Sequence, residues 1–490
     1  MDAITAVDFG FRHASRRLPA LAGVNFAIPA GQRVMLLGES GAGKSTLLMA
    51  IAGLLADDQG ANVGSLQING TVGMVLQDPD SQVIASRVGD DVAFGCENLN
   101  VEREEIWRRV PWALEMVGLD VPREHPTVAL SGGQKQRLAL AGVIAMGADI
   151  ILLDEPTANL DPAGVREVVE AVTAVADRTG ATVIVVEHRV GVWSDFAQRA
   201  IVLGHNGVLA DGDCDTVIAT KGATLAAEGV WVPGIEPVFA PRATVGRRKA
   251  IAEAGGGARG EEAAIEYHDL VCGWEDGRAV APAASGRILR GASTVVTGRN
   301  GAGKSTFMLT LAGLLEPLSG EISYASSIAA GLDPHPFRWG SKQLASRIGY
   351  VFQDPEHQFV STTVAKELEV GPRHAGARAN RKHRRREAPL AAEDQARIDD
   401  LVARLGLQGL EEANPFELSG GQKRRLSVAT VLVTAPKVVF LDEPTFGQDR
   451  RTFIELVNLV RELNDSGVTV ISVTHDETYV KALGDEVITL

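Results

Sequence analysis

The chemistry that stands out first in the sequence is phosphate binding. Residues 36–47, LLGESGAGKSTL, follow the spacing G-x-x-x-x-G-K-S, and the fixed positions are Gly38, Gly43, Lys44 and Ser45. An apolar run precedes this segment and a helix-compatible run follows it, as in a strand–loop–helix phosphate-binding loop. Glycines let backbone N–H groups surround phosphate, and the following helix directs its positive end toward it. We expect Lys44 to reach the β- and γ-phosphates and the Ser45 hydroxyl to bind Mg²⁺.

The same loop occurs a second time, 260 positions later, in residues 297–307. Its fixed positions are Gly298, Gly303, Lys304 and Ser305. Later landmarks recur as well, at separations that grow to 276 and then to 288 positions and stay nearly constant afterwards. We therefore predict two copies of one unit, with insertions in the second copy that fall before its catalytic half.

Further polar groups stand at the ends of predicted elements. A serine and two glycines, residues 131–133, open a predicted helix and can form a second anion site. The apolar strand 150–153 ends at Asp154 and Glu155, where the first carboxylate can hold Mg²⁺ through water and the second can polarise an attacking water. The strand 182–186 leads to His188, which can contact the γ-phosphate, although a lone histidine at a strand end is usually structural.

Two residues carry weaker signals. Gln77 follows a buried-looking strand, where sheets of this kind bind ligands, and the alternative is an ordinary loop glutamine. Phe11 lies 27 residues before Gly38, in a small antiparallel sheet predicted over residues 3–31. An aromatic ring there can stack on an adenine or fill the core of that sheet, and the sequence leaves both alternatives open.

Composition limits the class of protein that positions these groups. With 490 residues, 45% of them hydrophobic and 22% charged, the chain has the composition of an ordinary globular protein. It contains no apolar run of 18 residues and no signal-peptide core, so we expect it to stay out of the bilayer and not to be exported. Cys96, Cys214 and Cys272 lie far apart, which argues against a cysteine-based metal site. A net charge of −14 argues against nucleic acid as the main partner.

The remaining segments are predicted to connect the motifs and the two copies. The helical spacing of apolar residues predicts helices over residues 97–128, and Pro111 is expected to open the second of them. Residues 200–213 predict a closing hairpin. The stretch 215–262 is punctuated by proline and glycine without a sustained helical period, which predicts a partly ordered connector. The basic run 373–386 favours a solvated loop over contact with lipid headgroups or RNA, because no aromatic residue is interleaved with its charges.

In this order the motifs resemble those of an ATP-binding cassette of the ABC superfamily, present in two copies in the chain. They correspond to its P-loop, Q-loop, LSGGQ signature, Walker B pair, D-loop (Asn159-Leu160-Asp161) and switch histidine. The resemblance implies an α/β fold with two P-loop NTPase domains, each a mixed sheet core with an antiparallel β-subdomain and a helical subdomain. The expected boundaries are 1–214 and 263–490 for the domains and 215–262 for the linker.

The resemblance also assigns the site residues. ATP contacts in the first copy are Phe11, Gly38, Glu39, Ser40, Gly41, Ala42, Gly43, Lys44, Ser45, Thr46, Ser131, Gly132, Gly133 and Gln134. Those in the second copy are Trp274, taken as the counterpart of Phe11, and Gly298, Arg299, Asn300, Gly301, Ala302, Gly303, Lys304, Ser305, Thr306, Ser419, Gly420, Gly421 and Gln422. Mg²⁺ ligands are Ser45, Gln77, Asp154, Ser305, Gln353 and Asp442, and the catalytic residues are Glu155, His188, Glu443 and His475. Family members pack head to tail, so each P-loop is expected to work with the other copy's signature, here within one chain.

The sequence around both Q-loops resembles the ATPases of energy-coupling factor transporters. This implies Mg²⁺-dependent ATP hydrolysis that drives import of a vitamin, a vitamin precursor or a cobalt or nickel ion, with scaffold and substrate-binding membrane proteins as partners at the cytoplasmic face of the cell membrane. One alternative is the tandem ATPase of a monosaccharide importer, which usually has one degenerate site, whereas both copies here keep their lysine and glutamate. The other is an ABC-type translation factor on the ribosome, which the connector and the acidic balance disfavour.

Overall fold

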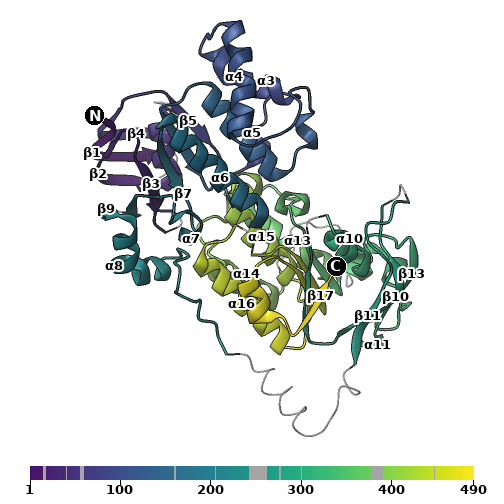
Figure 1. Ribbon diagram of the computed structural model, residues 1–490. Helices are drawn as coiled ribbons and strands as arrows, with labels where there is room; N and C mark the ends of the chain where they lie inside the picture. Colours follow the sequence, from purple (N-terminus) through teal and green to yellow (C-terminus); the bar gives the residue numbers. More distant parts are fainter. Residues whose placement is uncertain are drawn as a thin grey trace. The chain divides into compact units, whose positions relative to one another are not determined.

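The computed structural model describes residues 1–14, 18–39, 41–55, 60–158, 160, 162–204, 206–241, 262–274, 277–299, 301–376, 390–445 and 447–490. They form two compact units, Met1–Pro237 with Asp449–Arg451, and Val238–Gln448 with Thr452–Leu490 (Figure 1). Predicted features outside the described residues are Ser40, Asn159, Asp161, Asn300, residues 242–261 of the connector and 377–386 of the basic run. No described helix combines the length and the apolar character needed to cross a bilayer.

The first unit begins with the predicted antiparallel sheet, which is confirmed. Its strands are β1 (Asp2–His13), β2 (Leu21–Pro29) and β4 (Gly60–Ile68), in the order β2-β1-β4. Buried and exposed residues alternate along β2, as expected for a sheet with one face on the core.

The main sheet of the first unit has six strands in the order β5-β6-β7-β3-β8-β9. Their bounds are β3 (Arg33–Leu37), β5 (Val72–Val75), β6 (Ile150–Asp154), β7 (Thr182–Val186), β8 (Arg199–Gly204) and β9 (Gly207–Asp213). The first five are mutually parallel, and β9 pairs antiparallel with β8, which confirms the predicted hairpin. Every residue of β6 and β7 is buried, as expected for central strands covered on both faces. The loops that follow the parallel strands therefore meet at one edge of the sheet.

Helices surround this sheet. They are α1 (Lys44–Ile51), α2 (Pro79–Gln82), α3 (Val88–Asn98), α4 (Arg103–Met116), η1 (Thr127–Ala129), α5 (Gly132–Ala145), α6 (Pro162–Thr179), α7 (Val190–Trp193) and α8 (Cys214–Ala227). The helices α3, α4 and α5 pack on one another and form the predicted helical subdomain (Figure 1).

Two helix predictions are wrong. Pro111 lies inside α4 and does not open a new helix, because burial of Ile106, Val110 and Ala113 on one face outweighs the backbone hydrogen bond that a proline removes. The segment after Asp213, expected to lack a helix, forms α8. Its β-branched residues and Gly222 lower intrinsic helix propensity, but Asp213 caps it at the N–H of Thr216 and its apolar residues join the core of the first unit.

The second unit repeats the two sheets. The small sheet contains β11 (Ala284–Leu289), β10 (Ala263–Val271) and β13 (Ser319–Tyr324) in that order. The main sheet is parallel throughout, with β14 (Ile348–Val351), β15 (Val438–Asp442), β16 (Thr469–Val473), β12 (Ser293–Thr297) and β17 (Glu486–Thr489). Its helices are α10 (Lys304–Leu311), α11 (Ser326–Ala329), η2 (Pro336–Arg338), α12 (Ser341–Ala345), η3 (Pro355–Gln358), α13 (Val364–Gly376), α14 (Ala392–Arg404), η4 (Pro415–Glu417), α15 (Gly420–Leu432), α16 (Arg450–Asp465) and α17 (Glu477–Leu483).

The first insertion of the second unit is an ordered element between β13 and β14. It contains α11, η2 and α12, whereas residues 69–71 alone join β4 to β5. Trp339 anchors it: the indole is buried, packs 5.4 Å from the ring of Tyr324, and donates its Nε1 hydrogen to the carbonyl of Asp333 at 2.6 Å. The insertion therefore rests on the small sheet and leaves the strand that leads to Gln353 in place.

Candidate functional site

Both P-loops have the backbone that their glycines require. Gly38 has φ 144°, and a Cβ there would lie 2.3 Å from the carbonyl oxygen of Leu203. Lys44 is buried at the start of α1, and its Nζ donates to the carbonyls of Gly38 and Glu39 at 2.8 and 2.9 Å. Lys304 makes the equivalent bonds in the second unit, both at 3.0 Å. The ammonium groups are thus held over the loops that would receive phosphate.

The Walker B aspartates fit a Mg²⁺ ion. Asp154 ends β6, and Asp442 ends β15. Each is hydrogen-bonded to the P-loop hydroxyl, Ser45 or Ser305, yet its Oδ1 is buried without a hydrogen-bond partner among the described residues. Burial, helped by the adjacent Glu155, raises the pKa of Asp154 to about 6. A cation between carboxylate and hydroxyl would satisfy the orphaned oxygen and stabilise the ionised form, and oxygen ligands of this kind suit Mg²⁺.

In the first unit, two residues that follow strand ends, His188 and Gln77, both contact Glu155. His188 Nε2 lies 2.9 Å from Glu155 Oε1, and Gln77 Nε2 donates to Glu155 Oε2 at 2.7 Å. Burial opposes ionisation of Glu155, but the hydrogen bond and charge of His188 prevail and lower its pKa. Burial likewise opposes the imidazolium, yet the bond to Glu155 raises the pKa of His188. Both shifts favour the charged forms, so each group stabilises the charge of the other across this contact.

In the second unit the same residues are arranged more loosely. His475 Nε2 lies 3.4 Å from Glu443 Oε1. Burial and the neighbouring charge of Asp442 raise the pKa of Glu443 to about 7. Both glutamates have positive φ, 48° for Glu155 and 49° for Glu443, and both donate their N–H to the last residue of the next strand. A non-glycine residue held in this region is strained, which is common at active sites.

Both signature serines begin a helix, as predicted. Ser131 accepts from the N–H of Gln134 at 3.3 Å, and its own N–H donates to the Gln134 side chain at 2.9 Å, which is a capping box. Ser419 and Gln422 repeat this arrangement at the start of α15. The side chains of both serines are therefore engaged in capping. The two glycines that follow each serine are exposed or half-buried.

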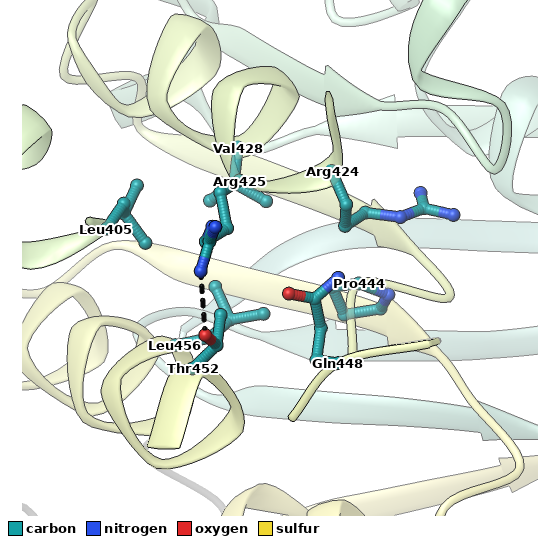
Figure 2. Close-up of a pocket in the computed structure, with 8 residues that line it drawn as sticks. All are labelled: Leu405, Arg424, Arg425, Val428, Pro444, Gln448, Thr452 and Leu456. Carbon is teal, nitrogen blue, oxygen red and sulfur yellow. Dashed lines mark hydrogen bonds between the residues drawn. The ribbon is translucent and has the colours of Figure 1, made fainter. Parts of the chain in front are cut away.

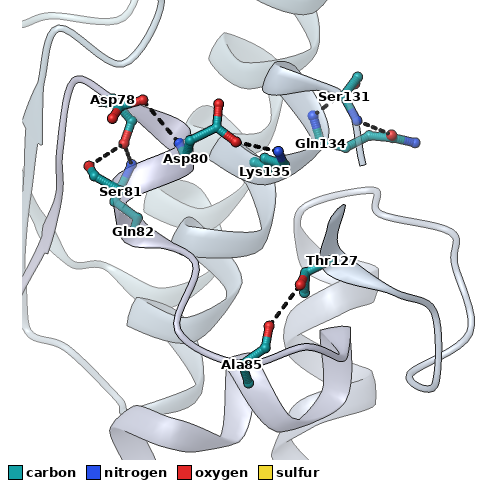
Figure 3. A network of polar contacts seen from close by, with 9 residues as sticks. All are labelled: Asp78, Asp80, Ser81, Gln82, Ala85, Thr127, Ser131, Gln134 and Lys135. Carbon is teal, nitrogen blue, oxygen red and sulfur yellow. Dashed lines mark hydrogen bonds and ion pairs between the residues drawn. The ribbon is translucent and has the colours of Figure 1, made fainter. Parts of the chain in front are cut away.

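The residues after each Q-loop glutamine are tied to the signature helix. Figure 3 shows Asp78 capping α2 and Lys135 of α5 reaching the carboxylate of Asp80. Lys423 makes the same ion pair with Glu356 in the second unit. Thr127, just before the signature, donates to the carbonyl of Ala85 at 2.7 Å (Figure 3). A movement of the Q-loop would thus be passed to the signature.

Phe11 and Trp274, predicted to be equivalent positions of the two copies, are not equivalent in the structure. Asp8 in β1 and Asp269 in β10 each lie at a bulge of their own strand, with φ 47° and 45°. The two aspartates are therefore equivalent positions, and they align the sequence of β1 with that of β10. Five residues after these aspartates stand His13 and Trp274, so His13 and not Phe11 is the counterpart of Trp274.

Exposure agrees with this correction. Phe11 is 2% exposed in the core, whereas Trp274 is 52% exposed. His13 is half-buried, packs edge-on against Phe11 at 4.9 Å and lies 3.4 Å from the hydroxyl of Thr46 on the P-loop helix. The core alternative for Phe11 is the correct one. The sequence signal that could have located His13 is its position two residues beyond a core aromatic, on the same face of the strand and at the strand's end.

Sequence reasoning missed a buried cation beside the second Walker B strand. Arg424, five residues after Ser419, donates to the carbonyl of Phe352 at 2.7 Å and also to that of Gln353. Figure 2 shows its guanidinium directed away from that of Arg425, which bonds to Thr452 at 3.0 Å. In the first unit the same place holds the neutral Gln136, which donates to the carbonyls of Leu76 and Gln77 at 3.2 and 3.3 Å.

Comparisons with known proteins agree with this geometry. The family profile described as ABC transporter matches residues 21–158 and 283–446. A Bacillus subtilis (strain 168) protein, provisionally named HMP/thiamine import ATP-binding protein YkoD, is 33% identical over 525 residues, which cover 100% of this chain and 90% of the relative. A Methanosarcina mazei protein, provisionally named ABC transporter ATP-binding protein, is 31% identical over 96% of this chain and 84% of its own length.

Among solved structures, a protein titled RNase-L Inhibitor superposes over 98% of this chain and 87% of its own, with a TM-score of 0.61 and 19% identity, a likeness that shows the fold alone. The profile and the full-length relatives establish the family: the chain belongs to the ABC transporter ATP-binding proteins, as an ATPase with two ATP-binding cassettes in tandem.

Proposed function

We propose that this chain is the motor subunit of an energy-coupling factor importer, peripheral to the cytoplasmic face of the cell membrane. Integral membrane subunits, a scaffold and a substrate-binding protein, would complete the transporter. The substrate would be a vitamin, a vitamin precursor or a transition-metal ion. The relative named for HMP/thiamine import supports the precursor class.

The observation that carries the membrane-partner proposal is a pair of exposed apolar residues beside each Q-loop. The pair is Ile84 with Val128 in the first cassette and Val360 with Phe416 in the second. Ile84 and Val360 stand seven residues after the Q-loop glutamines and are 62% and 75% exposed. Val128 and Phe416 stand three residues before the signature serines and are 85% and 46% exposed. Hydrogen bonds hold the segments of Ile84 and Val128 together, and the ring of Phe416 packs 5.9 Å from that of Phe359, the neighbour of Val360. Exposed apolar residues repeated in this way are typical of a binding surface.

Docking of scaffold helices on these pairs is testable in the reconstituted transporter. Ile84→Asp with Val360→Asp should abolish copurification with the membrane subunits and transport, while the isolated chain keeps its ATPase activity. Val63→Asp, at an equally exposed apolar residue on the small sheet, is the control.

Charge reversal at Asp80 or Glu356 should uncouple transport from ATP hydrolysis. Adding Lys135→Asp to Asp80→Lys restores the local ion pair, so this double variant separates an effect on docking from the loss of that pair. Normal transport by the Ile84/Val360 variant would refute the docking surface.

Within each site, we propose that Glu155 and Glu443 polarise the attacking water and that His188 and His475 contact the γ-phosphate. Ser45 and Asp154, with Gln77, would hold Mg²⁺ in the first cassette, and Ser305, Asp442 and Gln353 in the second. The metal would neutralise charge on the phosphates, while the lysines orient the chain for attack.

We also propose that each P-loop works with the signature of the other cassette in the same chain. A Lys44→Ala, Ser131→Arg chain and a Lys304→Ala, Ser419→Arg chain each lack one component of both sites. Closure within a chain predicts no ATPase activity when the two are co-expressed, because neither chain retains a complete pair. Substantial recovery of activity would show that sites form between chains.

The ribosomal alternative makes the opposite prediction in a simple experiment. The full chain with its membrane subunits should cosediment with membranes. Cosedimentation with ribosomes instead would overturn the transport proposal.

A further inference from the structure

A buried carboxylate stands directly before the switch histidine of the first cassette. Glu187 is 4% exposed, and its Oε1 accepts the backbone N–H of His188 at 2.8 Å. The hydroxyl of Thr157, two residues after Glu155, donates to its Oε2. Glu187 therefore links the backbone of the switch histidine to the turn that follows the catalytic glutamate.

The second cassette holds its histidine backbone in a different way. Thr474 takes the place of Glu187 and Thr445 that of Thr157. The hydroxyl of Thr474 accepts the N–H of Asp476 at 3.1 Å, and both this hydroxyl and the backbone N–H of His475 are hydrogen-bonded to Glu443 itself. A short side chain thus acts on the catalytic carboxylate directly, where the first cassette uses a longer one to hold the histidine.

The distances around the glutamates follow this difference. The histidine nitrogen lies 2.9 Å from Glu155 in the cassette with Glu187, and 3.4 Å from Glu443 in the cassette with Thr474. In the first cassette Gln77 also donates to the second oxygen of Glu155, so both oxygens of this carboxylate already contact a side chain.

We propose that Glu187 is a positioning residue that holds His188 against Glu155, so that the two ATP sites are built differently and turn over at different rates. Its acceptor oxygens fix the backbone of His188, and the anchored backbone fixes the imidazole. This proposal rests on the catalytic roles proposed above for Glu155 and His188.

The test uses the full chain and two variants of Glu187. Glu187→Ala should lower kcat for ATP about tenfold without changing KM, because it disturbs an interaction used in turnover and not in ground-state binding. Glu187→Gln keeps an acceptor for the N–H of His188 and a polar partner for Thr157, and should restore at least half of the lost rate. Thr474→Ala is the matched variant of the second cassette.

A signal from the imidazole distinguishes positioning from general destabilisation. In chain labelled with ¹⁵N-histidine, the ring signals of His188 and His475 can be assigned through His188→Gln and His475→Gln. Glu187→Ala should shift the His188 signal and leave the His475 signal in place, whereas Thr474→Ala should do the reverse.

Three results would overturn the proposal: an unchanged kcat in Glu187→Ala, an unmoved His188 signal, or Glu187→Gln as impaired as Glu187→Ala. Wild-type chain without ATPase activity would instead refute the catalytic assignment, a result that none of these three resembles.

Discussion

The two cassettes share the order of their five parallel strands and the order of their motifs but surround the same chemistry with different buried groups. The first cassette places an acidic residue, Glu187, before its switch histidine and a neutral amide, Gln136, against the backbone carbonyls of its Q-loop. The second places a neutral Thr474 and a cationic Arg424 at the same positions. Burial lowers the pKa of Arg424 to about 10, against the charges of Asp442 and Glu443.

This difference shows which features of the site are tied to the ligand. The glycines, lysine, serine and Walker B carboxylates that would bind phosphate and Mg²⁺ are the same in both cassettes, although Glu39 is replaced by Arg299 and His13 by Trp274 at the edges of the site. The buried residues behind this shared set, Gln136 and Arg424 or Glu187 and Thr474, differ in side-chain type. Buried charges interact strongly because little solvent screens them, so such changes can alter catalysis without altering the binding motif.

The largest expected effect comes from the glutamates. Glu155→Gln with Glu443→Gln should reduce steady-state ATPase activity about 10³-fold while ATP remains bound, because removal of a general base costs about 10²–10⁴-fold. The two single variants sharpen the comparison: different residual rates are expected if the sites are inequivalent. Unchanged turnover in the double variant, measured by phosphate release, would refute the assignment of both residues.

A smaller effect is expected from the aromatic residues. Trp274→Ala should raise the KM for ATP by about 5- to 150-fold, since stacking of a base on an aromatic ring contributes about 1–3 kcal/mol. His13→Ala should act in the same direction and more weakly, because imidazole presents a smaller ring. Phe11→Ala should instead lower the melting temperature by removing a core side chain. A change in KM with Phe11→Ala at unchanged stability would contradict the register assigned here.

The smallest expected effect is on the stability of the free chain as a function of pH. Glu443 has a folded-state pKa of about 7, above its ordinary value, so the folded chain retains this proton longer and stability falls as pH rises from 4.5 toward 7. Glu155 has a lowered pKa, so its contribution is present above pH 4.5 and is lost as pH falls through its folded-state pKa. At pH 8 without nucleotide, Glu443→Gln should raise the melting temperature and Glu155→Gln should lower it, by about 2–4 °C per kcal/mol. Shifts of the same sign in calorimetry at pH 8 would contradict the difference between the two sites.

The sequence by itself was sufficient for the order of the motifs and for the elements that carry them. A P-loop, a Walker B pair or a capping box lies within a few residues of chain, and the strands before them are continuous apolar runs. Adjacent parallel strands end at one edge of a sheet, so Lys44, Asp154 and His188 could be brought together from local patterns alone.

The tertiary structure decided what depends on residues far apart in sequence. The bulges at Asp8 and Asp269 set the register that makes His13 the counterpart of Trp274, and such shifts leave little trace in an alternating pattern. The contact of Glu187 with Thr157 spans 30 positions, and the helix α8 forms where its own propensity is low because the core of the first unit receives its apolar face. Packing, register and buried pairing thus outweigh local preference at these sites, because each depends on partners that the folded chain alone brings together.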